Sequence, residues 1–231
     1  MLRFTDLTVR LGGHTVLDCI TAALPPGSRV GLIGRNGAGK STLMRTLMGE
    51  IEPDSGSILV PAGTRVGYLE QETPTGHGSA LDIVLAADGE RARLMRNAEA
   101  SPDPQLVGEI HERLLAIEGH TAPARAARIL AGLGFDEAMQ GQPLDGLSGG
   151  WRMRVALAGL LFSDPDVLLL DEPSNHLDLE ATLWLENFLK SCRATMLIVS
   201  HERDLLNRVA DHILHLERGS LTLYRGDYDS F

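Results

Sequence analysis

Residues 29–48 read RVGLIGRNGAGKSTLMRTLM and join three local patterns. The apolar residues 29–33 predict a strand, residues 39–48 repeat apolar side chains at helical spacing, and a glycine-rich turn lies between them. From Gly34 to Ser41 this turn places a glycine, four residues and then Gly-Lys-Ser. The spacing, between a strand and a helix, predicts a loop whose backbone N–H groups and helix N-terminus bind phosphate.

Lysine usage supports this interpretation over an ordinary glycine-rich turn. The lysines of the chain are Lys40 and Lys190, and arginine supplies the rest of its 21 basic residues. A chain that otherwise uses arginine keeps lysine in the loop. We expect Lys40 to reach the β- and γ-phosphates of a nucleotide and Ser41 to offer its hydroxyl to Mg²⁺.

Two adjacent acids follow the apolar run of residues 167–170. Asp171 and Glu172 are costly to bury without a partner, so they cap the next loop or serve chemistry. Given the phosphate loop, we expect Asp171 to hold Mg²⁺ at the carboxyl end of a strand. Glu172 then polarises the water that attacks the γ-phosphate, as a general base.

The remaining periodicity alternates strands and helices, which favours an α/β layered core with a largely parallel sheet. A helical zone interrupts this order at residues 73–141. The pattern predicts strands at residues 2–10, 16–21, 57–60, 167–170 and 196–200, helices from 148 and over 179–190, and a hairpin from residue 211.

Composition places the chain among globular proteins. It has 231 residues, a net charge of -10 and 43% hydrophobic residues. No apolar run approaches the roughly 20 residues of a membrane span, and Met1 opens directly onto a strand pattern, so we expect a cytoplasmic location without direct membrane insertion. The acidic balance argues against broad nucleic-acid binding. Cys19 and Cys192 are far apart, which indicates small core residues rather than a disulfide or zinc site.

Residues 147–151, LSGGW, resemble the signature motif of ATP-binding-cassette (ABC) ATPases. Gln71 in YLEQE, Asp178 in SNHLD and His201 in IVSHERD fill the other motif positions of that family in order. The resemblance runs from about residue 2 to the C-terminus. It implies an α/β ABC-type nucleotide-binding domain with a mainly parallel sheet and an antiparallel β subdomain, whose core is residues 1–72 and 148–231, and whose residues 73–147 form an inserted helical subdomain.

The resemblance also implies the site. Catalytic roles fall to Glu172, His201 and Gln71, and Mg²⁺ binding to Ser41, Gln71 and Asp171. A second cassette, either a copy of this chain or another half of the same protein, would cover the nucleotide with its signature segment. The nucleotide-binding set is Gly34, Asn36, Gly37, Ala38, Gly39, Lys40, Ser41 and Thr42, with Ser148, Gly149 and Gly150 as the covering segment.

Within that superfamily, PSNHLDLEATLWLENFL and SGGWRMR resemble the ABC-F branch, whose members lack membrane domains. The stretch LYRGDYDSF resembles the point where the first of two tandem cassettes leads into a charged linker. This implies an N-terminal cassette whose protein acts on the ribosome in translation, through RNA contacts of that linker. The alternative is the ATPase subunit of a membrane transporter, in which the helical zone would receive a transmembrane partner.

Two further positions qualify this interpretation. Leu11 stands where the wider family carries an aromatic ring that stacks on adenine, so apolar contact replaces stacking and the preference for ATP over GTP is open. The arginines at 91, 93 and 96 form a basic cluster that either faces RNA or, as a solvated helix face, has no partner.

Overall fold

The computed structural model describes residues 1–69, 74, 76 and 78–231. The chain forms two compact units, which we name the sheet unit and the helical unit. The sheet unit comprises residues 1–69, 165–175 and 186–231, and the helical unit comprises the described residues of 70–164 together with 176–185.

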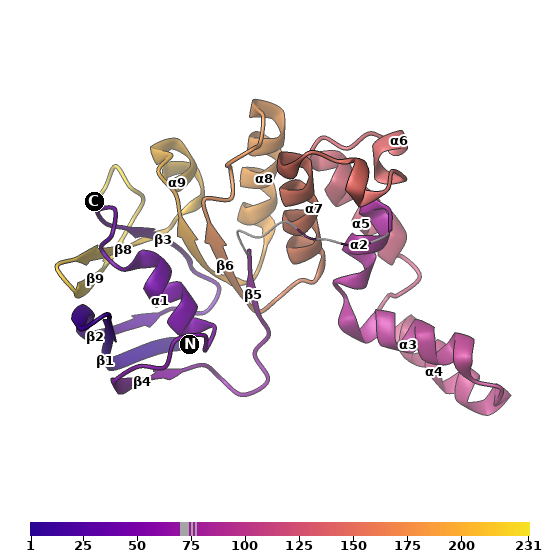
Figure 1. Cartoon of the computed structure of the whole chain (residues 1–231), viewed down its shortest axis with the longest axis horizontal. Coiled ribbons are helices and arrows are strands. Elements are labelled where there is room, and N and C mark those ends of the chain that lie inside the picture. Colours follow the sequence, from indigo (N-terminus) through magenta and orange to yellow (C-terminus); the bar gives the residue numbers. More distant parts are fainter. Residues whose placement is uncertain (70–73, 75, 77) are drawn as a thin grey trace. The chain divides into compact units, whose positions relative to one another are not determined.

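A six-stranded sheet organises the sheet unit, with strand order β5-β6-β7-β3-β8-β9 (Figure 1). All neighbouring pairs are parallel except β8 and β9, which form an antiparallel hairpin. The central strands are continuous apolar runs, because both of their faces are covered. The strands are β3 (Arg29–Ile33), β5 (Val66–Tyr68), β6 (Val167–Asp171), β7 (Thr195–Val199), β8 (His212–Glu217) and β9 (Ser220–Arg225).

A second, antiparallel sheet of the same unit has the order β2-β1-β4. It consists of β1 (Leu2–Leu11), β2 (His14–Leu24) and β4 (Ser55–Leu59). Its inward side chains share one hydrophobic core with the parallel sheet and with helix α1 (Lys40–Leu47). Phe4, Leu17, Met44 and Leu169 are fully buried in that core. Helix α9 (Arg203–Val209) contributes the buried Leu205, Leu206 and Val209.

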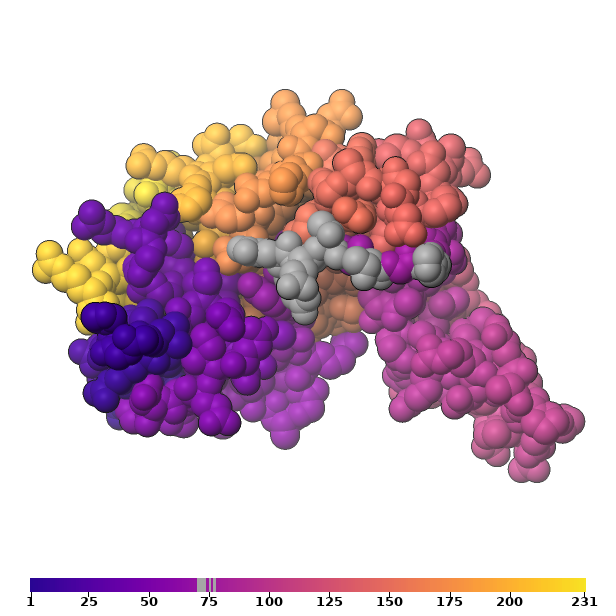
Figure 2. Space-filling view, in the orientation of Figure 1, coloured from indigo at the N-terminus to yellow at the C-terminus, as the bar shows by residue number. Residues whose placement is uncertain are grey.

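The helical unit begins with α2 (Ala80–Ala86), where Ser79 and Asp82 form a reciprocal capping box. Helices α3 (Gly89–Ala100) and α4 (Pro104–Ala116) follow as a pair that extends away from the other helices of this unit (Figure 1, Figure 2). The unit continues with α5 (Ala122–Gly132), α6 (Glu137–Gln140), a short 3-10 helix (Leu144–Gly146), α7 (Gly149–Phe162) and the first half of α8 (Leu179–Ser191).

The predicted α/β fold, with its parallel sheet, antiparallel sheet and helical insertion, is confirmed. The division differs from the expected one at residues 148–164 and 176–185, which group with the helices rather than with the core. Helix α7 groups with the helices because it packs against α2 and α5, and residues 176–178 are hydrogen-bonded to Arg154 of α7. Two short elements, β5 and α9, lie where the sequence pattern predicted neither. No helix among the described residues is both long and apolar enough to cross a membrane.

Candidate active site

The phosphate loop leaves β3 at the centre of the parallel sheet and enters α1. At Gly34 an added Cβ would overlap the backbone carbonyl oxygen of Leu216 on β8. At Gly39, whose φ is 108°, an added Cβ would come within 2.7 Å of Val16 Cγ1 on β2. Both positions therefore require glycine, so the glycine spacing of the motif follows from tight packing of the loop between the two sheets.

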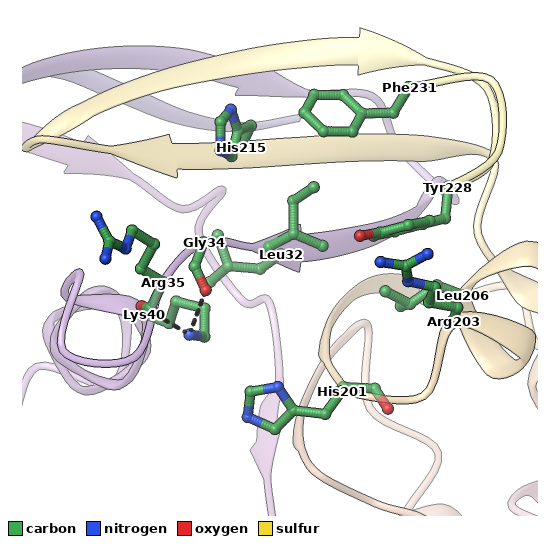
Figure 3. A pocket seen from close by; sticks show the side chains of 12 residues that line it. Leu32, Gly34, Arg35, Lys40, His201, Arg203, Leu206, His215, Tyr228 and Phe231 are labelled. Carbon is green, nitrogen blue, oxygen red and sulfur yellow. Dashed lines mark hydrogen bonds between the residues drawn. The ribbon is translucent and has the colours of Figure 1, made fainter.

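Lys40 is the first residue of α1, and its side chain folds back over the loop (Figure 3). Its Nζ donates to the carbonyl oxygens of Gly34 at 2.8 Å and Arg35 at 3.2 Å. No acidic side chain lies in the described first turn of α1, and Gly39 has no side chain to cap it. The helix N-terminus thus joins an ammonium group with N–H groups that are free to bind an anion.

Asp171 ends β6 and meets the start of α1. Ser41 Oγ donates a hydrogen bond of 3.3 Å to Asp171 Oδ2. A hydroxyl and a carboxylate side by side are oxygen donors of the kind that Mg²⁺ prefers, so the residues present fit the ion. No group of three or more His, Cys, Asp or Glu side chains in the described chain forms a metal cage.

Glu172 occupies a strained backbone position directly after Asp171. Its φ is 51°, in the left-handed region, where a non-glycine residue costs about 1–3 kcal/mol unless its surroundings fix it. Two contacts with the next strand and loop hold it. Its N–H donates to the Val199 carbonyl at 2.9 Å, and its Oε2 accepts from the His201 N–H at 3.2 Å. Strain of this kind is typical of catalytic positions.

The second carboxylate oxygen of Glu172, Oε1, has no hydrogen-bond donor among the described residues. Oε1 is buried and lies 3.4 Å from His201 Nε2. The Glu172 side chain is 19% exposed, whereas that of His201 is 65% exposed. A buried acceptor without a donor carries a desolvation cost, which a bound water would remove. The carboxylate and the imidazole, side by side at this distance, can therefore bind one water that both of them face.

One further contact fixes the relative positions of these two loops. Ser174 Oγ donates to Glu202 Oε1 at 2.8 Å, which ties the segment after Glu172 to the segment after His201. The loops follow β6 and β7, which are parallel neighbours, so the paired strands bring them together. Both residues lie within the SNHLD and IVSHERD motifs, but the sequence analysis assigned a role to neither.

A pocket of about 420 Å³ opens beside the phosphate loop (Figure 3). Lys40 and His201 line it from two sides, and aromatic rings of the C-terminal segment line another part. There Arg203 lies over the Tyr228 ring, 5.2 Å from its centroid. The lining residues include Gly34, Arg35, Lys40, Ser200, His201 and Tyr228.

The signature segment belongs to the helical unit. Ser148 precedes the first residue of α7, yet its hydroxyl caps no N–H of the described first turn. Ser148 and Gly149 are exposed, and Gly150 is partly exposed. The hydroxyl and the helix N-terminus are thus available to a ligand that approaches from outside.

The sequence-predicted residues fall into three groups. The structure brings Lys40, Ser41, Asp171, Glu172 and His201 together around the carboxyl ends of β3, β6 and β7. The segment of Ser148 stands in the other unit. Gln71, predicted as a catalytic residue and magnesium ligand, lies outside the described residues.

A family model described as "ABC transporter" matches residues 17–175. The chain belongs to this family. It is 43% identical over 234 residues to "Probable ATP-binding protein YheS" of Escherichia coli (strain K12), covering 100% of this chain and 37% of that protein. It is 44% identical over 242 residues to "ATP-binding cassette sub-family F member 3" of Homo sapiens, covering 100% of this chain and 33% of that protein. The resemblance to the ABC-F branch is confirmed.

This ABC cassette also has the fold of solved cassettes. A "Structure of ATP binding subunit of ABC transporter" shares a TM-score of 0.75 at 21% identity, over 100% of this chain and 91% of that chain. The dimeric "ATP-binding cassette MJ0796 bound to ADP and Pi" shares a TM-score of 0.71 at 19% identity, over 97% and 98%. The chain spans about a third of the length of the curated relatives named above.

Proposed function

We propose that this ABC cassette binds ATP with Mg²⁺ and hydrolyses its γ-phosphate. The observation that carries the proposal is the buried, unbonded Oε1 of Glu172, held beside the Ser41–Asp171 pair in the same unit. Lys40 and the N-terminus of α1 bind the phosphates, because they combine a charge with free backbone donors. Ser41 and Asp171 hold the metal ion, which neutralises charge on the phosphates when it is bound.

Glu172 is the general base in this proposal. Its Oε1 accepts the proton of the attacking water, while the bond from the His201 N–H to Oε2 keeps the carboxylate oriented. The His201 imidazole, whose Nε2 lies 3.4 Å from Oε1, stands beside the base and donates to the γ-phosphate. The strained backbone of Glu172 fixes the direction of its side chain before substrate binds.

Each site is completed by the signature segment of a second cassette in a head-to-tail pair. Ser148 supports this step, since its exposed hydroxyl is not used by its own helix. In the pair, Ser148, Gly149 and Gly150 donate to the γ-phosphate that the partner cassette holds. The isolated chain therefore hydrolyses ATP slowly, because an unpaired cassette lacks this cover.

Mixing two inactive variants tests the pairing. Ser148→Ala damages the covering segment, and Glu172→Gln removes the base. In a mixed head-to-tail pair, one composite site contains neither change, so mixing restores turnover toward about a quarter of the parent value. The turnover per chain of the parent should also rise with protein concentration. A high turnover that is independent of concentration, together with no restoration on mixing, contradicts the proposal.

At the level of the whole protein, we propose an ATP-dependent action on the ribosome during translation. Two findings support it: the identity to a sub-family F member, and the exposed Arg93 and Arg96 on α3. Arg91, in contrast, donates to the Gly119 carbonyl at 3.1 Å and serves the fold. Co-sedimentation of the full-length protein carrying Glu172→Gln with ribosomes, with ATP against ADP, tests the proposal. Co-purification with a membrane partner instead would favour the transporter alternative.

A further inference from the structure

The guanidinium of Arg154, a residue of α7, is buried within the helical unit. Its side chain is 9% exposed. Nε donates to the carbonyl oxygen of His176 at 2.9 Å, and Nη1 donates to the carbonyl oxygen of Leu133 at 2.9 Å. The guanidinium also lies over the Trp151 ring, 4.4 Å from its centroid. A buried charge of this kind is stable because Nε, Nη1 and the face of the guanidinium all have partners.

Asp178 is the anionic partner of Arg154. Its Oδ2 accepts from Arg154 Nη1 at 3.0 Å, while Oδ1 accepts from the Ala181 N–H at 2.9 Å and caps α8. The two carboxylate oxygens thus have separate tasks, one toward α7 and one toward α8. The Asp178 side chain is 58% exposed. Its role in the fold therefore comes from its two hydrogen bonds, which join α7 to α8, and not from burial.

The turn between these partners is strained. His176 has a φ of 70°, which a non-glycine residue adopts only when neighbouring groups hold it there. The bond from Arg154 Nε to the His176 carbonyl fixes the peptide that follows this position. Arg154 therefore holds the turn of residues 176–178 at both of its ends.

The same arginine sits on the helix that begins at the signature segment. Ser148 and Gly149 precede and open α7, and Arg154 follows on its second turn. One rigid side chain thus connects the exposed signature segment with the exposed His176 and Asp178. A lysine cannot replace it, because a single ammonium lacks the planar fork that reaches three acceptors.

We propose that Arg154 is a positioning residue for hydrolysis in the partner cassette: it holds the signature segment and the turn of residues 176–178 as one block, presented together to the nucleotide of the second cassette. The inference rests on the head-to-tail pairing proposed above. It predicts that Arg154 acts on the partner's site and leaves ATP binding in its own sheet unit intact.

Arg154→Lys tests this role. Turnover should fall at least about tenfold, while the ATP dissociation constant of the chain changes less than about twofold. Arg125→Lys is the matched control, because Arg125 also stacks over a ring, that of Phe162 at 4.4 Å, and makes no hydrogen bond to residues 176–178 in the described structure. The control should keep the parental turnover. Parental turnover in Arg154→Lys overturns the inference.

Mixing Arg154→Lys with Glu172→Gln shows whether Arg154 acts on its own nucleotide site or on that of the partner cassette. Arg154→Lys mixed with Glu172→Gln should restore turnover as fully as Ser148→Ala mixed with Glu172→Gln. If only the Ser148→Ala mixture is restored, Arg154 acts on its own site or on folding, and the inference fails while the pairing stands. If neither mixture is restored, the pairing fails and the inference with it.

A second variant tests the same role without requiring that the Arg154→Lys protein fold normally. Asp178→Asn keeps a side-chain oxygen to cap α8 but loses the charge that pairs with Arg154. It should retain the melting temperature within a few degrees, lose turnover and be restored by Glu172→Gln in the same way. Unchanged turnover, or a loss that mixing does not restore, contradicts the positioning role.

Discussion

Ser41 and Asp171 stand 130 positions apart in the sequence, and their side-chain oxygens meet at 3.3 Å. The contact joins the first turn of α1 to the carboxyl end of β6, so it fixes the phosphate loop relative to the acids. This one pair connects the two halves of the proposed chemistry, phosphate binding and water activation. Removing either side chain should weaken metal binding and leave metal-independent nucleotide binding unchanged.

Asp171→Asn should weaken the Mg²⁺-dependent part of ATP binding about ten- to hundredfold, as removal of a group that orients a metal ion does. ATP binding measured with a chelator should be unchanged, since Lys40 and α1 remain. Calorimetric titration with and without Mg²⁺ measures both. Asp166→Asn, the same change beside the opposite end of β6, is the control and should leave the metal dependence intact. An equal loss in both titrations would contradict the assignment of Asp171.

Leu11 lies at the tip of the β1–β2 hairpin, is 41% exposed and pairs with His14. Leu11→Tyr should tighten ATP binding by no more than about tenfold, because a stacked ring adds about 1 kcal/mol. Leu11→Met, which adds no ring, should have no effect. If calorimetry shows no gain with tyrosine, Leu11 is not beside the adenine.

Arg208 and Glu186 form an ion pair at 3.2 Å in which Glu186 is 5% exposed and Arg208 is 47% exposed. Arg208→Met should lower the free energy of unfolding by about 2 kcal/mol, because a buried carboxylate loses its partner. The loss is smaller than for a fully buried pair, because the arginine is half exposed and solvent screens its charge. The double variant with Glu186→Met should recover much of that loss. Urea unfolding of the three proteins checks this, and additive losses would argue against the pair.

Hydrogen bonds from the Ala181 N–H and from Arg154 hold the pKa of Asp178 below its ordinary value of 3.8. A lowered pKa favours the ionised form in the folded chain, so its contribution to stability is complete above that value and is lost as the pH falls below it. The melting temperature of the parent should therefore fall more steeply below about pH 4 than that of Asp178→Asn. Parallel curves would contradict the hydrogen-bonded carboxylate.

Local sequence predicted the parts of the site that local backbone geometry determines. The strand, glycine turn and helix around Lys40 follow from residues within 20 positions, and the apolar run before Asp171 marks a buried strand. Parallel pairing then brings these ends together, which explains why the Ser41–Asp171 contact could be anticipated. The motif order also predicted the family.

The contacts that the sequence did not predict depend on tertiary packing. The hydrogen bonds of Arg154 and the Ser174–Glu202 hydrogen bond join residues from different elements, and no local periodicity reports them. One signal was present, a charged residue at 154 beside the apolar run of α7. The strained φ of Glu172 likewise arises from its contacts with Val199 and His201.

Glu172→Gln tests the central assignment most directly, because a carboxamide keeps the shape of the side chain and loses the base. Turnover and the ATP dissociation constant are measured on the same preparation, with the melting temperature as a check of folding. Turnover should be abolished, while ATP binding and melting temperature stay near the parent values. A Glu172→Gln protein that hydrolyses ATP at the parent rate, or loses turnover only in proportion to lost folded protein, would contradict it.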